Sequence, residues 1–143
     1  MAAQKRTLVL VPGSFNHIEF YIPLIEKFTS ETGYPLHTVA LRTVGKKPGP
    51  LPTIYDDAAF IASEVEKLAD DGKEMVLMGH SYGGIPISQC MEGLSLAARE
   101  KEGKKGGVVR IAYMTALVPA MGENALAGLE GCPTGYTETD EVS

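Results

Sequence analysis

A serine flanked by glycines is the chemically most informative feature of the sequence. Residues 75–84 read MVLMGHSYGG, a short apolar run followed by G-H-S-Y-G and then by a helical pattern. This is the G-x-S-x-G nucleophile elbow in the strand–turn–helix context that the motif requires. Glycines two positions either side of the serine let neighbouring backbone approach a sharp, strained turn. The turn should present the Ser81 hydroxyl above the carboxyl edge of a sheet, so we predict Ser81 as a nucleophile.

A second glycine-containing turn ends the first apolar run, in the stretch LVLVPGSF. In a doubly wound sheet this loop lies beside the elbow, at the carboxyl ends of adjacent strands where ligands bind. We therefore predict an oxyanion hole made by the backbone N–H groups of Ser14 and Tyr82, the latter at the start of a helix. Gly13, Phe15 and His17 are predicted to contact substrate.

The histidines offer no clear general base for Ser81. The chain has three of them. His80 is adjacent to the serine, so its side chain should point away from the hydroxyl and pack below the elbow. His37 lies in a predicted strand and should be structural. His17 is in the predicted oxyanion loop, where we expect substrate contact or a structural role in the loop, with a general base as the less favoured alternative.

The carboxylates are no better placed as a catalytic acid. Asp56 and Asp57 follow Thr53, a good N-cap residue, and are explained by the favourable position of acids in a first helical turn. Glu123 follows the last predicted strand, a position from which an acid could act. We keep it as an open alternative.

The elements that must position these residues alternate between strand and helix. Strands are predicted at 7–11, 36–41, 75–78 and 108–117, and helices at 18–31, 53–71 and 85–98, with a loop rich in proline and glycine at 42–53. This alternation predicts an α/β fold, a doubly wound and mostly parallel sheet with helices on both faces. The last predicted strand would form a hydrophobic sheet edge, which something should cover.

The bulk properties exclude several other classes of protein. The net charge of −5 over 143 residues argues against a nucleic-acid partner. Cys90 and Cys132 make no disulfide framework, and Cys90 in a helical pattern should be a small buried hydrophobe. The apolar run near the N-terminus is too short for a signal peptide or a membrane span, so we expect a cytoplasmic protein without membrane contact. We find no metal or cofactor fingerprint and expect no cofactor.

The stretches VLVPGSF and GHSYGG together resemble the α/β-hydrolase superfamily, especially compact members similar to plant-type esterases and hydroxynitrile lyases. The resemblance covers residues 7–121, although Pro12 stands where such proteins commonly carry histidine. It implies that residues 1–121 are the N-terminal part of an α/β-hydrolase core and that residues 122–143 begin a lid or linker. Ser81 would be the nucleophile, followed in chain order by an acid and a histidine. The strands that should carry the acid and the histidine are missing here, so we expect a C-terminal half as a second chain that supplies them.

The resulting functional prediction is a serine hydrolase of the esterase, thioesterase or lactonase type, acting on a small apolar ester-like molecule. Two alternatives stay open. One is a lyase of the same fold, which the glycine at position 13 disfavours because such lyases typically have a threonine there. The other is a non-catalytic ligand-binding module that keeps the shell of the fold.

Overall fold

The computed structural model describes residues 5–124 and contains a four-stranded sheet in the order β2-β1-β3-β4. Every neighbouring pair is parallel, with Val9 opposite Leu77 and His37, and with Leu77 opposite Ile111. The strands are β1 (Thr7–Val11), β2 (Leu36–Thr38), β3 (Glu74–His80) and β4 (Gly107–Met114). The predicted fold class is therefore confirmed, and among the described strands β4 lies at an edge, as expected.

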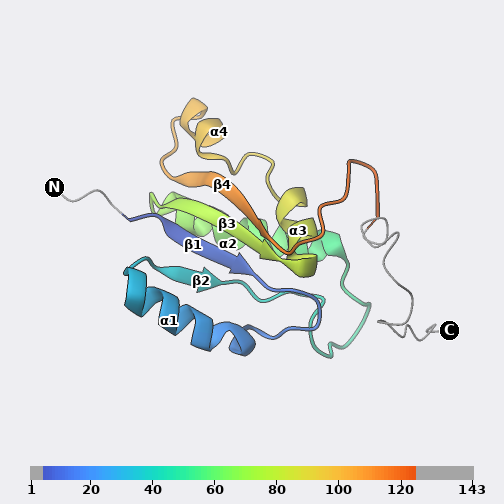
Figure 1. The fold of residues 1–143 in the computed structure, drawn as a ribbon. Helices are drawn as coiled ribbons and strands as arrows, with labels where there is room; N and C mark the ends of the chain where they lie inside the picture. The colour runs from blue at the N-terminus through green and yellow to red at the C-terminus, as the bar shows by residue number, and fades with distance from the viewer. Residues whose placement is uncertain (1–4, 125–143) are drawn as a thin grey trace.

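Helices connect the strands and cover the sheet. They are the short 3₁₀ helices η1 (Ile18–Tyr21) and η2 (Ser81–Gly83), and the α-helices α1 (Ile22–Thr32), α2 (Ile54–Asp70), α3 (Gly84–Gln89) and α4 (Leu96–Lys101). Figure 1 shows α2 passing behind the sheet and α1 lying beside β2. Within residues 5–124, no helix is long and apolar enough to cross a membrane.

Helix α2 supplies one wall of the hydrophobic core. Ile61, Val65 and Ala69 recur every four residues and are completely buried in one cluster with Met75 and Leu77 of β3. This spacing places the three side chains on the same helical face. The predicted N-cap is also present, because the backbone N–H of Thr53 donates to the Asp56 carboxylate at 2.7 Å in a capping box.

The helix predicted at 85–98 is wrong as a single element. Helix α3 ends at Gln89, and the chain turns before α4 begins at Leu96. Gly93 has a φ of +72°, which glycine adopts without steric penalty. The Ser95 side chain then accepts a hydrogen bond from the N–H of Ala98 and caps α4. Two local signals therefore break a stretch whose apolar spacing suggested one helix.

Two predicted strands end earlier than their apolar patterns suggested. Strand β2 stops at Thr38 rather than at residue 41. A few residues later, the backbone N–H groups of Arg42 and Thr43 donate to the carboxylate of Asp57 in α2. Strand β4 stops at Met114 rather than at residue 117, and the N–H of Leu117 donates instead to the carbonyl of the elbow serine at 3.0 Å. Both strand ends therefore lead directly into contacts around the elbow.

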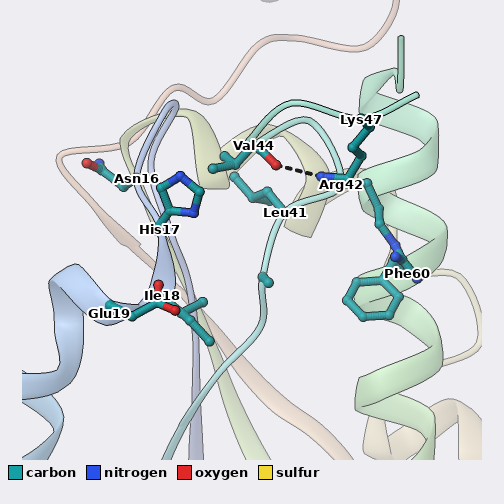
Figure 2. Close-up of a pocket in the computed structure, with 10 residues that line it drawn as sticks. Asn16, His17, Ile18, Glu19, Leu41, Arg42, Val44, Lys47 and Phe60 are labelled. Atoms are coloured by element: carbon teal, nitrogen blue, oxygen red, sulfur yellow. Dashed lines mark hydrogen bonds between the residues drawn. The ribbon is translucent and has the colours of Figure 1, made fainter. Parts of the chain in front are cut away.

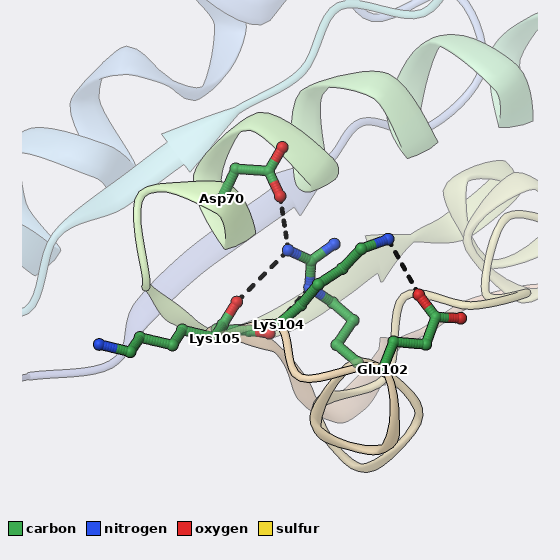
Figure 3. A network of polar contacts seen from close by, with 6 residues as sticks. Asp70, Glu102, Lys104 and Lys105 are labelled. Carbon is green, nitrogen blue, oxygen red and sulfur yellow. Dashed lines mark hydrogen bonds and ion pairs between the residues drawn. The ribbon is translucent and has the colours of Figure 1, made fainter.

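A buried arginine joins the elements at the opposite, amino-terminal end of the strands. Arg99 of α4 is only 2% exposed. Its guanidinium contacts the Asp70 carboxylate at 2.6 Å and donates to the carbonyls of Gly106 at 2.9 Å and Lys105 at 3.3 Å (Figure 3). Asp70 therefore forms an ion pair with Arg99 in addition to ending α2, and Arg99 in turn holds the backbone turn before β4.

Candidate active site

Ser81 lies immediately after β3 with a φ of +53°, in the left-handed region that side chains other than glycine rarely occupy. A Cβ added at Gly79 would lie 2.7 Å from the Gly83 carbonyl oxygen, and one added at Gly83 would lie 2.6 Å from the carbonyl oxygens of Val11 and Pro12. The steric reason inferred for these glycines is thus visible in the structure. The backbone closes so tightly around the turn that neither position has room for a side chain.

The loop after β1 lies directly against this turn. A Cβ at Gly13 would be 3.1 Å from the Cβ of Ser81. Ser14, Phe15 and Tyr82 line one cavity of about 200 Å³ together with Thr43. Within residues 5–124, the N–H groups of Ser14 and Tyr82 have no hydrogen-bond partner. The two predicted oxyanion donors therefore border the same small cavity, and their catalytic role stays a prediction.

His80 holds the loop after β1, which contains the predicted oxyanion donor Ser14, through a tyrosine that sequence reasoning missed. The Tyr21 hydroxyl lies 2.8 Å from Nδ1 of His80, and the N–H of Gly13 donates to the same hydroxyl oxygen at 3.1 Å. Tyr21 is 6% exposed. The arrangement that satisfies every group has Tyr21 accept from Gly13 and donate its own proton to His80. The His80 ring is thus engaged by Tyr21 of η1, and its packing below the elbow stays a prediction.

Asp57 is a second residue whose role the sequence analysis misjudged. It was assigned to helix capping, which Asp56 performs, whereas Asp57 is completely buried. Its carboxylate accepts hydrogen bonds from the backbone N–H of Arg42 and Thr43, from the Thr43 hydroxyl at 2.7 Å and from the Tyr82 hydroxyl at 2.9 Å. Asp57 therefore ties the loop after β2 to the elbow.

A signal for this role existed in the sequence. Asp57 stands four residues before Ile61, on the face of α2 that buries its apolar side chains. A carboxylate on that face needs several donors, because an unpaired buried charge is strongly unfavourable. The environment also acts on its partner, because burial and then the neighbouring Asp57 carboxylate raise the pKa of the Tyr82 phenol well above its ordinary value. Tyr82 consequently remains a protonated donor.

His17 borders a different cavity from the one beside the elbow. This cavity of about 240 Å³ is shown in Figure 2 and is lined by Asn16, His17, Ile18, Glu19, Ala40, Leu41, Arg42, Val44, Lys47 and Phe60. Arg42 places its guanidinium 3.9 Å from the centre of the Phe60 ring, and Lys47 donates to the Val44 carbonyl at 2.6 Å. Substrate contact by His17 stays a prediction, and the structure places His17 at this neighbouring cavity rather than at the one beside Ser14 and Tyr82.

Proton-transfer partners of Ser81 are not found in the described part of the chain. Within residues 5–124, no hydrogen bond joins the Ser81 hydroxyl to any side chain. His37 lies in β2 with its side chain exposed. Glu123, the open candidate for the acid, accepts from the N–H of Ala120 at 2.9 Å and so holds a local turn. The described residues contain no cluster of metal-ligating side chains either.

Of the two cysteines, only Cys90 lies in the described residues. It is 6% exposed in the hydrophobic core, which confirms the structural role predicted for it. Burial raises the pKa of its thiol to about 11. Cys132 and most of the predicted segment 122–143 lie outside the described residues.

Comparisons with known proteins agree with this architecture. The sequence profile of the alpha/beta hydrolase family matches residues 8–138. The chain is 35% identical over 131 residues to "Probable hydrolase R7" of Phoma sp., covering 89% of this chain and 50% of that protein. It is 32% identical over 126 residues to "Alpha/beta hydrolase nvfD" of Aspergillus novofumigatus, covering 88% and 49%. The chain thus spans about half the length of these curated relatives.

A solved structure shows the same fold. The crystal structure of polyneuridine aldehyde esterase superimposes with a TM-score of 0.67 at 22% identity, over 92% of this chain and 49% of that chain. At this level of identity the similarity extends to the fold alone.

Proposed function

Because the chain belongs to the alpha/beta hydrolase family, we propose that it supplies the nucleophile and the oxyanion hole of a serine hydrolase. The proposed reaction is cleavage of a carboxylic ester, thioester or lactone of a small, largely apolar molecule. One observation carries the proposal. Ser81 adopts a strained backbone conformation at a strand-to-helix turn, directly against a loop in which the N–H of Ser14 has no hydrogen-bond partner among residues 5–124. Strain of this kind costs about 1–3 kcal/mol and persists only where the surrounding structure imposes it, which is often at active sites.

The proposed chemistry is acyl transfer. The Ser81 oxygen forms a bond to the substrate carbonyl carbon, and its proton passes to a general base. The carbonyl oxygen becomes an anion that accepts hydrogen bonds from the N–H groups of Ser14 and Tyr82. Collapse of this intermediate breaks the bond to the leaving group, which takes the proton back from the base. Water then attacks the acyl-enzyme by the same route and releases the acid and Ser81.

We propose that the general base and its acid come from a polypeptide segment outside residues 5–124, either further along a longer chain or on a second chain that corresponds to a C-terminal half. The curated relatives are about twice as long as the part that this chain matches, so they have room for such a segment. Without a base, Ser81 would retain only substrate binding and the oxyanion hole. Those features alone are worth roughly 10³–10⁴-fold over water in serine proteases.

Labelling of the complete protein, which includes the segment that supplies the base, with a fluorophosphonate probe tests the proposal, because the probe needs an activated serine and an oxyanion hole but no particular substrate. We expect mass spectrometry to locate the label on Ser81 and Ser81→Ala to abolish it. Ser63→Ala is the matched control, since Ser63 is an exposed serine of α2 whose hydroxyl donates to a backbone carbonyl. Labelling that survives Ser81→Ala would refute the proposed nucleophile. Absence of labelling, with ligand binding intact in Ser81→Ala, would favour a binding module.

A further inference from the structure

Positively charged side chains gather beside the proposed oxyanion hole. The loop between β2 and α2 contains Arg42, Lys46 and Lys47 within six residues, in a chain whose net charge is −5. Among residues 5–124, none of the three is in an ion pair with a carboxylate. Uncompensated charge next to a cleft creates a local potential that attracts ions of opposite sign.

The cavity at the elbow continues toward these lysines. Phe15 and Thr43 line both the cavity beside Ser14 and Tyr82 and a neighbouring groove of about 570 Å³. The other residues that line this groove are Gly45, Lys46, Lys47, Leu51 and Pro52. Its charged residues are therefore all cationic, and its remaining side chains are largely apolar.

The apolar part of the groove presents unusually exposed hydrophobic side chains. Phe15 is 92% exposed and Leu51 is 83% exposed. Concave sites with apolar walls and a few placed polar groups are typical of small-molecule binding. An apolar portion of a ligand would cover these two side chains, with its polar end left to the lysines.

We propose that the groove selects a substrate whose apolar body extends from the reacting ester or lactone and ends in a carboxylate bound by Lys46 and Lys47. This inference rests on the proposed function of Ser81 and specifies its substrate class. The Lys47 ammonium has three donors and uses one of them on the Val44 carbonyl, which leaves two for a ligand. Lysines act as point charges on flexible stems, so they suit the single charge at the end of a carboxylate chain.

Two carboxylates, Asp56 and Glu19, line cavities that adjoin the groove, and neither lines the groove itself. Asp56 lines the adjoining cavity with Arg42 and Lys47, and its carboxylate accepts hydrogen bonds from Thr53 in the capping box rather than forming an ion pair with either cation in the described residues. Glu19 lines the cavity of Figure 2. The groove that is continuous with the elbow therefore keeps its positive character.

In the complete protein, which includes the segment that supplies the general base, two esters of matched length test the proposal: mono-p-nitrophenyl glutarate with a terminal carboxylate and p-nitrophenyl valerate without one. We expect a higher kcat/KM for the glutarate at low ionic strength, with the preference reduced at high salt, since the Debye length falls to about 3 Å at 1 M. The double variant Lys46→Met and Lys47→Met should reduce the preference roughly 3- to 20-fold, as expected for two exposed charge contacts.

The double variant Lys104→Met and Lys105→Met is the matched control. It removes the same charge from an equivalent dipeptide at the amino ends of the strands (Figure 3), and it should leave the preference unchanged. If the complete wild-type protein hydrolyses both esters equally well, or if the two double variants reduce the preference equally, the proposal is overturned.

A binding measurement separates this inference from the proposed reaction. In Ser81→Ala, calorimetry should show tighter binding of monomethyl glutarate than of methyl valerate, and the Lys46→Met/Lys47→Met substitutions should remove the difference. If this preference appears while fluorophosphonate fails to label Ser81, the groove stands and the reaction falls. If Ser81 is labelled while the two esters bind equally well, the reaction stands and the groove proposal falls.

Discussion

Replacing Asp57 tests whether a buried carboxylate holds the elbow in place. The side chain is completely buried and accepts four hydrogen bonds, from two backbone N–H groups and from the Thr43 and Tyr82 hydroxyls. Each such bond to a charged acceptor is worth about 1.5–3 kcal/mol, offset by the cost of removing the carboxylate from water. We expect Asp57→Ala to lower the free energy of unfolding by about 3–5 kcal/mol, because it leaves buried hydrogen-bond donors without an acceptor.

Asp57→Asn should be milder because the amide keeps the size of the side chain. Its oxygen can still accept from the N–H groups of Arg42 and Thr43, and both hydroxyls can rotate to accept from its NH₂ group. We expect a loss of about 1–2 kcal/mol. The substitution also removes the negative charge that contributes to the raised pKa of Tyr82, so that pKa should fall.

Urea unfolding followed by circular dichroism measures the stability, and tyrosinate absorbance against a Tyr82→Phe reference follows the phenol. Asp56→Ala is the control, since Asp56 is the preceding residue of the same helical turn, is exposed and serves only the cap. Equal losses in Asp57→Ala and Asp56→Ala would refute the assignment. So would a Tyr82 pKa that is unchanged in Asp57→Asn.

Three further substitutions probe the turn and the core. Gly83→Ala should lower the free energy of unfolding by more than about 3 kcal/mol in urea, because its Cβ would lie 2.6 Å from two carbonyl oxygens. Gly49→Ala is the control, since Gly49 has a φ of +88° but open space around it, and should lower the free energy of unfolding by only about 1–2 kcal/mol. Ser81→Gly should be more stable than Ser81→Ala by about 1 kcal/mol, reversing the usual order, because glycine relieves the positive φ. Burial raises the pKa of the Cys90 thiol in the folded state to about 11, so its contribution to stability is complete below about pH 9 and is lost as the pH rises toward 11. In Cys90→Ala, the free energy of unfolding measured against pH should therefore decline less steeply over this range.

The features that local sequence rules predicted correctly are those whose cause lies within a few residues. Thr53, the predicted N-cap residue, begins α2 together with Asp56 through hydrogen bonds that span three residues. The elbow belongs to the same group, because strand, glycines and helix follow one another without interruption. The need for glycine nevertheless arises from close contact with the end of β1, about 70 residues earlier. The motif gives the glycine positions but does not reveal that contact.

The features that the sequence analysis missed depend on contacts between distant segments. Tyr21 and His80 are 59 residues apart, and Asp57 and Tyr82 are 25 apart. Nothing in the residue types reveals these pairs until the topology places β1 between β2 and β3. Asp57 was misassigned for a further reason. It has the same residue type as its neighbour Asp56, and only its position on the buried face of α2 separates the two roles.

The contacts between distant segments share one effect, which is to maintain the strained backbone conformation of Ser81. A positive φ at a serine is unfavourable, and interactions within the turn itself do not offset its cost. Other segments must therefore hold the turn. The described structure supplies three such supports: Leu117 donates to the Ser81 carbonyl, Asp57 anchors Tyr82, and Tyr21 with His80 fixes Gly13 against the turn. Each support comes from a different connection, and two of them act on residues next to the predicted oxyanion donors. The same contacts that maintain the strained serine therefore also set the positions of the N–H groups that would face its substrate.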